Sequence, residues 1–216
     1  MLVNKLQMSI SSSPLIASFA YVDDDGVNDN ALTINKPAGT EPGMLMIAFM
    51  SQGDTSSPVN FSSSGWTLLS SSIGYPNIHV LYKTAGGSEP SSYIFSTSRP
   101  IPDKGGIIVT CNSSSISASS GVSTSTTSTT VTTNPVNIPD DGISLAYFSR
   151  SFGGSPLSTP SGYSIIHEFT TGSGISTSWG LYQRSFQTAI ASHSTSSTYV
   201  STSGTAASCV VALIGN

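Results

Sequence analysis

Histidine is the side chain best suited to acid–base chemistry near neutral pH, and the chain has three, His79, His167 and His193. They lie far apart in the sequence and in different contexts. His167 precedes Glu168, but adjacent residues of a strand point to opposite faces, so this pair is not predicted to act together. Serines are abundant, yet no Gly-x-Ser-x-Gly turn is present to position a nucleophile. The sequence therefore disfavours a hydrolase, although a cluster of histidines in the folded chain stays open.

Carboxylates form the second group of candidate residues. An acidic loop from Asp23 to Asn30 carries four aspartates and two asparagines around Gly26. Oxygen ligands on a glycine-kinked loop suit Ca²⁺, but the spacing differs from that of an EF-hand, and a solvated turn is the simpler interpretation. The three glutamates are scattered through turn-like and strand-like contexts, so they form no predicted pair for glycoside hydrolysis. These glutamates are Glu41, Glu89 and Glu168.

Aromatic side chains form the third group. Trp66 and Trp179, together with eight Tyr and eight Phe, could stack on the rings of a neutral glycan. Trp66 follows a Ser-Gly pair, and Tyr163 follows a second Ser-Gly pair later in the chain. An aromatic residue repeated at the same landmark is more simply an anchor of a hydrophobic core. Both interpretations stay open, and the core anchor is preferred.

The composition disfavours several classes of partner. Charged residues make up 8% of the chain, against about 25% in average globular proteins, and the net charge is −4. The seven basic residues do not cluster, which disfavours nucleic-acid binding, and no apolar stretch approaches the ~20 residues of a membrane span. Cys111 and Cys209 have no metal or redox spacing and are interpreted as buried thiols rather than a disulfide. We predict no catalytic residue, no metal site and no cofactor.

Strands are the elements that must position these residues. Pro42 to Gly53 holds seven consecutive apolar residues between turn signals, which indicates a strand buried on both faces, and Gly142 to Gly153 repeats the design. Further strands are expected near residues 15–21, 31–35, 66–69, 78–82, 93–95, 107–111, 130–132, 161–166, 180–182 and 210–214. No segment has a convincing helical period.

The second half of the sequence repeats features of the first half. Gly142, Gly162 and Tyr182 follow Gly43, Gly65 and Tyr82 by 99, 97 and 100 residues, in similar local sequence. Between the two halves, residues 113–133 are almost entirely Ser and Thr, and we expect them to be partly ordered with a loop near residues 119–121.

These observations predict an all-β, antiparallel two-sheet sandwich, jelly-roll-like and built from two internally similar halves. Short strands separated by Gly, Pro and Ser turns are typical of this class, and packing the halves face to face would cover their apolar inner surfaces. We expect an N-terminal arm at residues 1–13, which is free or docked on a neighbour. A single sandwich domain is expected at residues 14–216, with half-repeats at about 15–112 and 113–216.

Four segments in a fixed order resemble a β-sandwich domain of tailed-bacteriophage virion proteins. They are Lys36-Pro37-Ala38-Gly39, Pro42-Gly43-Met44-Leu45, Ser64-Gly65-Trp66-Thr67 and Leu81-Tyr82-Lys83 followed by Ser88-Glu89-Pro90-Ser91-Ser92-Tyr93. Each segment alone carries little information, and their order carries the resemblance. Met44 stands where the family usually has Asp, and no catalytic residues are carried over.

The resemblance implies a non-enzymatic structural protein of the virion, exposed on the head or tail as a decoration or fibre component and assembling as an oligomer. Its partners would be further copies of itself and other virion proteins. The nearly uncharged, hydroxyl-rich surface suits such an assembly. An alternative is a receptor-binding or carbohydrate-binding module of a phage tail or fibre that recognises host surface glycans.

Overall fold

The structure is a computed structural model that describes residues 15–23, 28–53, 59–72, 76–112, 114–126, 129–151, 157–169, 177–199 and 204–215. Within these ranges it contains 17 strands and no helix, and all named strand pairs are antiparallel. The predicted all-β antiparallel sandwich is therefore confirmed. The predicted N-terminal arm, residues 1–13, lies outside the described residues.

The first half of the chain forms a five-stranded sheet and a two-stranded ribbon. The sheet has the order β1-β7-β3-β5-β4, and the ribbon pairs β2 with β6. The strands are β1 (Leu15–Val22), β2 (Asp29–Asn35), β3 (Leu45–Gln52), β4 (Thr67–Ser71), β5 (Asn77–Thr84), β6 (Ser92–Ile101) and β7 (Lys104–Asn112).

The second half forms a six-stranded sheet and two short ribbons. The sheet has the order β13-β14-β12-β17-β8, with β9 also paired to β17, and the ribbons are β10-β16 and β11-β15. The strands are β8 (Ser114–Ser119), β9 (Ser123–Ser125), β10 (Thr130–Thr132), β11 (Val136–Ile138), β12 (Ile143–Arg150), β13 (Ser164–Phe169), β14 (Ser178–Ser185), β15 (Ile190–His193), β16 (Ser196–Thr198) and β17 (Ala206–Gly215).

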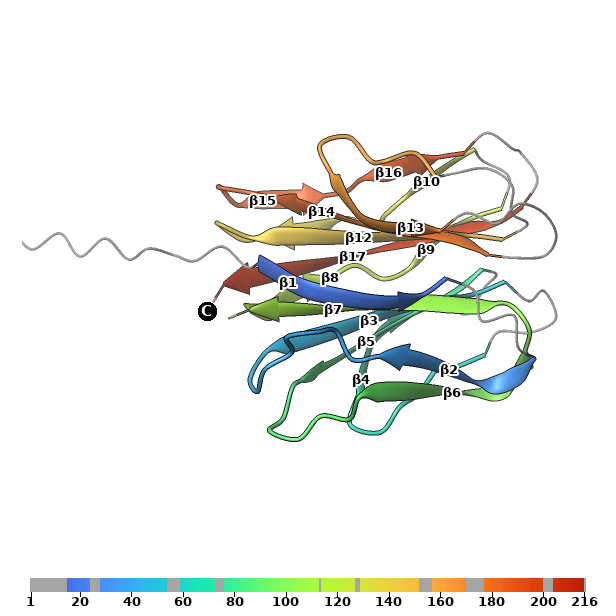
Figure 1. The fold of residues 1–216 in the computed structure, drawn as a ribbon. Helices are drawn as coiled ribbons and strands as arrows, with labels where there is room; N and C mark the ends of the chain where they lie inside the picture. The colour runs from blue at the N-terminus through green and yellow to red at the C-terminus, as the bar shows by residue number, and fades with distance from the viewer. Residues whose placement is uncertain are drawn as a thin grey trace, which may run out of the picture.

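The two large sheets pack face to face, and the ribbons cover their outer surfaces, so that the molecule has four layers (Figure 1). The outer ribbons are a feature that the sequence analysis did not predict. The Ser/Thr tract is ordered in part, as expected, because its residues form β8, β9 and β10 and leave residues 120–122 outside any strand.

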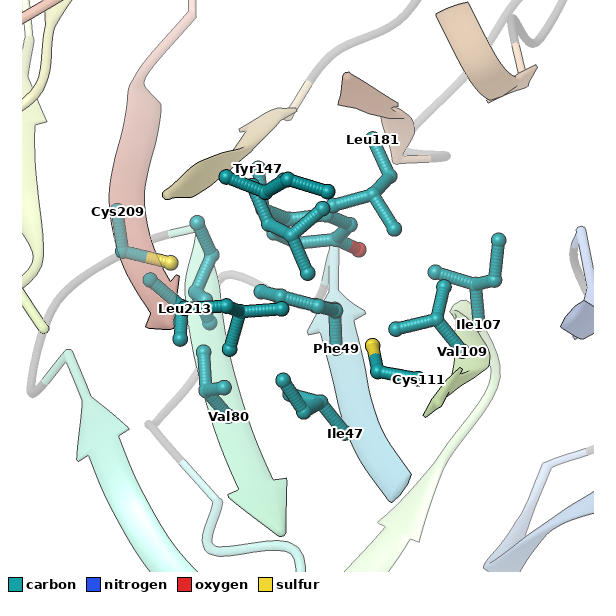
Figure 2. Packing of buried hydrophobic residues seen from close by; sticks show 14 of the residues in the cluster. Ile47, Phe49, Val80, Ile107, Val109, Cys111, Tyr147, Leu181, Cys209 and Leu213 are labelled. Atoms are coloured by element: carbon teal, nitrogen blue, oxygen red, sulfur yellow. The ribbon is translucent and has the colours of Figure 1, made fainter. Parts of the chain in front are cut away.

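Hydrophobic side chains lie between all four layers. The central core lies between the large sheets and takes Phe49 and Val109 from the first and Tyr147 and Leu213 from the second (Figure 2). The Phe49 and Tyr147 rings stack across it with centroids 5.4 Å apart, and the Tyr147 hydroxyl donates to Ser51 Oγ at 3.0 Å. Both cysteines lie in this core as free thiols, which confirms that interpretation.

Strand β3 explains why the layers are stacked in this way. Its eight residues are all buried, as the sequence predicted. Leu45, Ile47 and Phe49 enter the central core, whereas Met46, Ala48 and Met50 face the β2-β6 ribbon. Alternate residues of a strand point to opposite faces, so a strand that is apolar at every position must be covered on both. Strand β12 has the same pattern and is covered on its outer face by the second-half ribbons.

The two large sheets share one strand order, with β8, β17, β12, β14 and β13 in the places of β1, β7, β3, β5 and β4. The strand bounds and register correct two of the three sequence landmarks by one residue. Because β3 begins at Leu45 and β12 at Ile143, Gly43 corresponds to Asp141 rather than to Gly142, and both have a positive φ. Met46 is opposite Lys83 and Ser144 is opposite Arg184, so Lys83 corresponds to Arg184, and Tyr182 corresponds to Leu81 rather than to Tyr82. A shift of one residue in a strand moves a side chain to the other face, and Tyr182 accordingly lies in the outer core, whereas Tyr82 packs against the central one. The jelly-roll description and the superposition of the two halves stay predictions.

Candidate functional site

A hydrogen-bonded polar cluster of the first half surrounds Glu89, in the connection between β5 and β6. Its Oε2 accepts hydrogen bonds from Lys83 Nζ and from the Tyr93 hydroxyl, both at 2.7 Å. Its Oε1 accepts from the backbone N–H of Gly86 at 2.6 Å. The Tyr93 ring in turn packs edge-on against Trp66, with centroids 5.2 Å apart. Four residues of the segments that carry the resemblance, Trp66, Lys83, Glu89 and Tyr93, therefore lie together in the fold.

The electrostatics of this cluster keep the carboxylate charged. Burial by itself would raise the pKa of Glu89, whose side chain is 7% exposed, but the hydrogen bonds from Gly86, Lys83 and Tyr93 outweigh it and lower the pKa to about 2. Burial and the Glu89 charge raise the pKa of Tyr93. A carboxylate held as an anion with three donors is a structural clamp on the connection, and it is poorly suited to exchange protons near neutral pH.

The corresponding place in the second half is built around Arg184. The Arg184 guanidinium carbon lies 4.8 Å from the centroid of the Phe186 ring, which gives a cation–π contact. Gly162 also lies beside the guanidinium, since a Cβ atom at this position would come within 2.9 Å of Arg184 Nη1. Within the described part of the chain, Arg184 makes no ion pair.

Three polar side chains beside Arg184 form a hydrogen-bonded row. The Tyr163 hydroxyl lies 2.7 Å from Ser144 Oγ and 2.8 Å from His193 Nε2. Burial lowers the pKa of His193, and the positive charge of Arg184 lowers it further. Ser144 is fully buried and contacts the tyrosine rather than the histidine. The arrangement therefore lacks the direct serine–histidine contact and the accessible hydroxyl that nucleophilic catalysis needs.

Both places are hollowed at the surface. A cavity of about 520 Å³ is lined by Ile143, Gly162, Tyr163, Ser164, Gln183, Arg184 and Ser185. On the first half, a depression of about 750 Å³ is lined by Lys83, Tyr93, Ile94, Pro90 and several serines. The two hollows differ in that Lys83 is already bound to Glu89, whereas the Arg184 side chain carries its charge into the cavity lining without a described counter-ion.

A third cluster joins the two sheets. His167 Nε2, on β13, lies 2.6 Å from Asp23 Oδ1 at the end of β1. The His167 ring stacks on Tyr21 with centroids 3.7 Å apart, and the Trp179 indole donates to the Asp23 carbonyl oxygen at 3.1 Å. These contacts hold the edges of the two large sheets together.

The structure separates the three histidines that the sequence singled out. His79 lies in β5 beside Phe61 and Asn60, His167 contacts Asp23, and His193 contacts Tyr163. The described residues contain no group of three or more His, Cys, Asp or Glu side chains that could hold a metal ion. The folded cluster of histidines that the sequence left open is thus not formed.

The described part of the acidic loop, the tryptophans and two of the three glutamates that the sequence singled out take part in contacts that hold the fold together. Half of the acidic loop, residues 24–27, lies outside the described residues. Of the described part, Asp23 contacts His167 and Asp29 forms an ion pair with Lys104 at 3.0 Å. Trp66 and Tyr163 are 9% and 8% exposed and lie in hydrophobic cores, which confirms that they are core anchors. Trp179 is fully buried, so neither tryptophan ring is free to stack on a sugar. The glutamates do not pair, because Glu168 accepts from the Tyr182 hydroxyl at 2.5 Å and Glu89 is bound as described.

Sequence reasoning missed Arg184 as a candidate residue. The signal was present, since the Ser-Gly-aromatic turn at residues 161–163 and the strand with Arg184 recur from residues 64–66 and the strand with Lys83. The register of β5 and β14 was needed to align the two basic residues.

No protein-family model, no curated protein and no solved structure matches this chain. Over its described ranges the structure has no helix with the length and hydropathy to span a membrane.

Proposed function

We propose that the protein is a non-enzymatic structural component of a tailed-bacteriophage particle, exposed on the particle surface and assembling as an oligomer. The resemblance of its ordered sequence segments to virion β-sandwich domains supports this proposal. The low content of charged residues, 8%, supports it as well, because copies with few charges repel one another weakly.

The main support for an oligomer is the unpaired edge of strand β1. This strand pairs only with β7, so one side of its backbone has no strand partner in the described chain. Its eight residues include no charge and no proline, and Phe19 and Tyr21 are 42% and 45% exposed. Natural proteins usually protect such an edge with charges, prolines or short strands. The only irregularity along β1 lies between Ile16 and Ser18.

The other edges of the large sheets are better protected. Strand β4 has five residues, β13 contains His167 and Glu168, and β8 is mainly serine. A long, uncharged and apolar edge is therefore a specific property of β1, and a second copy of the chain is the partner that fits it.

Self-pairing of β1 meets the requirements of a two-fold axis. In an isologous contact each residue near the axis faces its own copy or a close neighbour, so a charge there would repel itself. An antiparallel pairing centred on Ala20 would set Phe19 opposite Tyr21 of the second copy and bring no like charges together. The result would be a continuous sheet across two molecules.

The described titratable groups support a role without catalysis. Glu89, Glu168 and Asp23 each bind a tyrosine, lysine or histidine that holds strands together, and His79 is buried. These groups therefore serve the packing of strands, as a building component of a particle requires.

The oligomer is tested by multi-angle light scattering on the purified chain. We expect a dimer or a higher even-numbered assembly. We expect Phe19→Lys to yield a folded monomer, because the two introduced ammonium groups would lie diagonally across the axis from each other, within reach of long side chains. Ile94→Lys is the matched control, since Ile94 is 56% exposed on the outer ribbon and should leave the assembly intact. A monomeric wild type at high concentration would contradict the oligomer. Absence of the chain from purified particles of its phage, examined by mass spectrometry, would contradict the virion role.

A further inference from the structure

We infer that the cavity beside Arg184 binds the carboxylate of an acidic sugar. This inference does not depend on the protein being part of a particle. It starts from the correspondence of Arg184 with Lys83 in the two sheets, which the strand registers establish.

The surroundings of the two cations correspond as well as their positions. Each lies beside the glycine of a Ser-Gly-aromatic turn, Gly65 at φ +77° for Lys83 and Gly162 at φ +78° for Arg184. Each also lies over an aromatic ring, Tyr93 at 5.4 Å from Lys83 Nζ and Phe186 at 4.8 Å from the Arg184 guanidinium carbon. The fold thus presents a cation at the same point of both sheets.

In the first half, the position of Lys83 shows which chemical group a cation binds at this place in the sheet. There the ligand is the chain's own carboxylate, Glu89, which takes hydrogen bonds from the cation, from a tyrosine hydroxyl and from a backbone N–H. The connection that follows β14 carries Phe186, Gln187, Thr188 and Ala189, and none of them is acidic. Asp140 contacts this connection from elsewhere in the chain. Its Oδ1 accepts a hydrogen bond from the Ala189 backbone N–H at 2.6 Å. The place that Glu89 fills in the first half is therefore left for an external carboxylate.

Arg184 is suited to bind such a group. A guanidinium presents two parallel N–H donors to a carboxylate, and the cation–π contact with Phe186 restricts where this guanidinium lies. The cavity has about 520 Å³, within the usual range of small-ligand sites. Burial of an ionised carboxylate is compensated here by a cation that the described chain leaves without an ion pair.

The rest of the lining favours a sugar over an apolar acid. Ser164, Gln183 and Ser185 supply hydroxyl and amide groups, and the Tyr163 side chain forms part of the wall. Ile143 is the aliphatic member of the set. A ligand with one carboxylate and several hydroxyls matches this composition, as in a uronic acid.

The test compares D-glucuronate with D-glucose, which differ in the carboxylate, by saturation-transfer NMR titration of the full chain. We expect glucuronate to bind with a Kd on the order of 1 mM, glucose to bind at least roughly tenfold more weakly, and Arg184→Gln to lose roughly tenfold in affinity for glucuronate. Arg184→Lys should keep part of the binding, because it retains the charge and loses the paired donors. Lys36→Gln is the control for a general loss of positive charge and should leave the affinity unchanged.

Three outcomes would overturn the inference. The first is equal affinity of the wild type for glucuronate and glucose, or no binding of either at 20-fold the expected Kd, ~20 mM. The second is unchanged binding in folded Arg184→Gln, as judged by its circular dichroism spectrum. The third is equal affinity for acetate and glucuronate. This result would show that the site binds a carboxylate but does not recognise the sugar.

Discussion

Lys83 and Arg184 stand at the same point of two sheets, yet one is closed by the protein and the other is open. In the first half the connection between β5 and β6 brings Glu89 to Lys83 at 2.7 Å, and Tyr93 completes the pair. In the second half no acidic residue follows β14 before β15, and Arg184 packs on Phe186 and beside Gly162 without a described counter-ion. The comparison teaches that one residue in a connection can decide whether a basic position stabilises the fold or is available to a ligand.

The largest effect should come from breaking the closed pair. Glu89→Ala leaves the Lys83 ammonium, the Tyr93 hydroxyl and the Gly86 N–H without their acceptor in a mostly buried place, and we expect a loss of about 3 kcal/mol in the free energy of unfolding. Urea unfolding followed by tryptophan fluorescence measures it. A loss below about 1 kcal/mol would show that the clamp contributes little.

The second effect concerns acid. Burial lowers the pKa of His79 from 6.5 to about 4, so the folded state binds fewer protons than the unfolded state between these values. The free energy of unfolding should therefore fall as the pH decreases through this window, by roughly 2–3 kcal/mol at pH 4.5. Glu89, whose pKa is lowered to about 2, adds a further loss only below about pH 4.5.

The comparison of the halves gives a control for this pH effect. His79→Gln should remove most of the dependence between pH 6.5 and 4.5, whereas His193→Gln should remove less, because His193 is only partly buried. Urea unfolding at a series of pH values decides between them. An unchanged slope in His79→Gln would be inconsistent with the buried neutral imidazole.

The third effect distinguishes the cost of backbone strain at a glycine from the loss of ligand binding at the Arg184 cavity. Gly65→Ala and Gly162→Ala both place a side chain at a positive φ, and each should cost about 1–2 kcal/mol. Only the alanine at 162 would also meet the Arg184 guanidinium, at 2.9 Å, since the Cβ at 65 would lie 3.8 Å from Lys83 Nζ. We therefore expect similar melting temperatures for the two variants and a loss of glucuronate binding in Gly162→Ala alone.

The smallest effect on stability should come from the open cation. Arg184→Gln removes a charge that makes no ion pair with the described residues and keeps part of the side chain over Phe186, so the free energy of unfolding should change by less than about 0.5 kcal/mol. Parallel urea unfolding of wild type and variant measures this. A loss comparable to that of Glu89→Ala would mean that Arg184 is a structural residue and would remove the contrast between the halves.

Much of the fold could be predicted from local patterns. The apolar runs of β3 and β12 indicated strands covered on both faces, and the structure confirms them. The three-residue strands β11 and β16 and the four-residue β15 were not predicted, because strands so short have no readable period and depend on the large sheet beneath them. The ribbons they form supply the outer core of the second half.

The candidate site was less accessible to sequence reasoning. Lys83, Glu89 and Tyr93 belong to the segments that resemble the virion domains, but the sequence does not indicate that their side chains touch. Pairing Tyr82 with Tyr182 is wrong by one position, so the sequence pattern does not reveal that Arg184 corresponds to Lys83. A one-residue error in a strand exchanges its faces, and only the hydrogen-bonded register corrects it.

The sequence by itself determined the long apolar strands, the Ser-Gly turns at Gly65 and Gly162 and the low charge, since these follow from residue type and local alternation. The tertiary structure decided which of two equivalent cations is neutralised and which edge strand is left bare. Both depend on distances between segments far apart in the chain, and local sequence does not encode such distances.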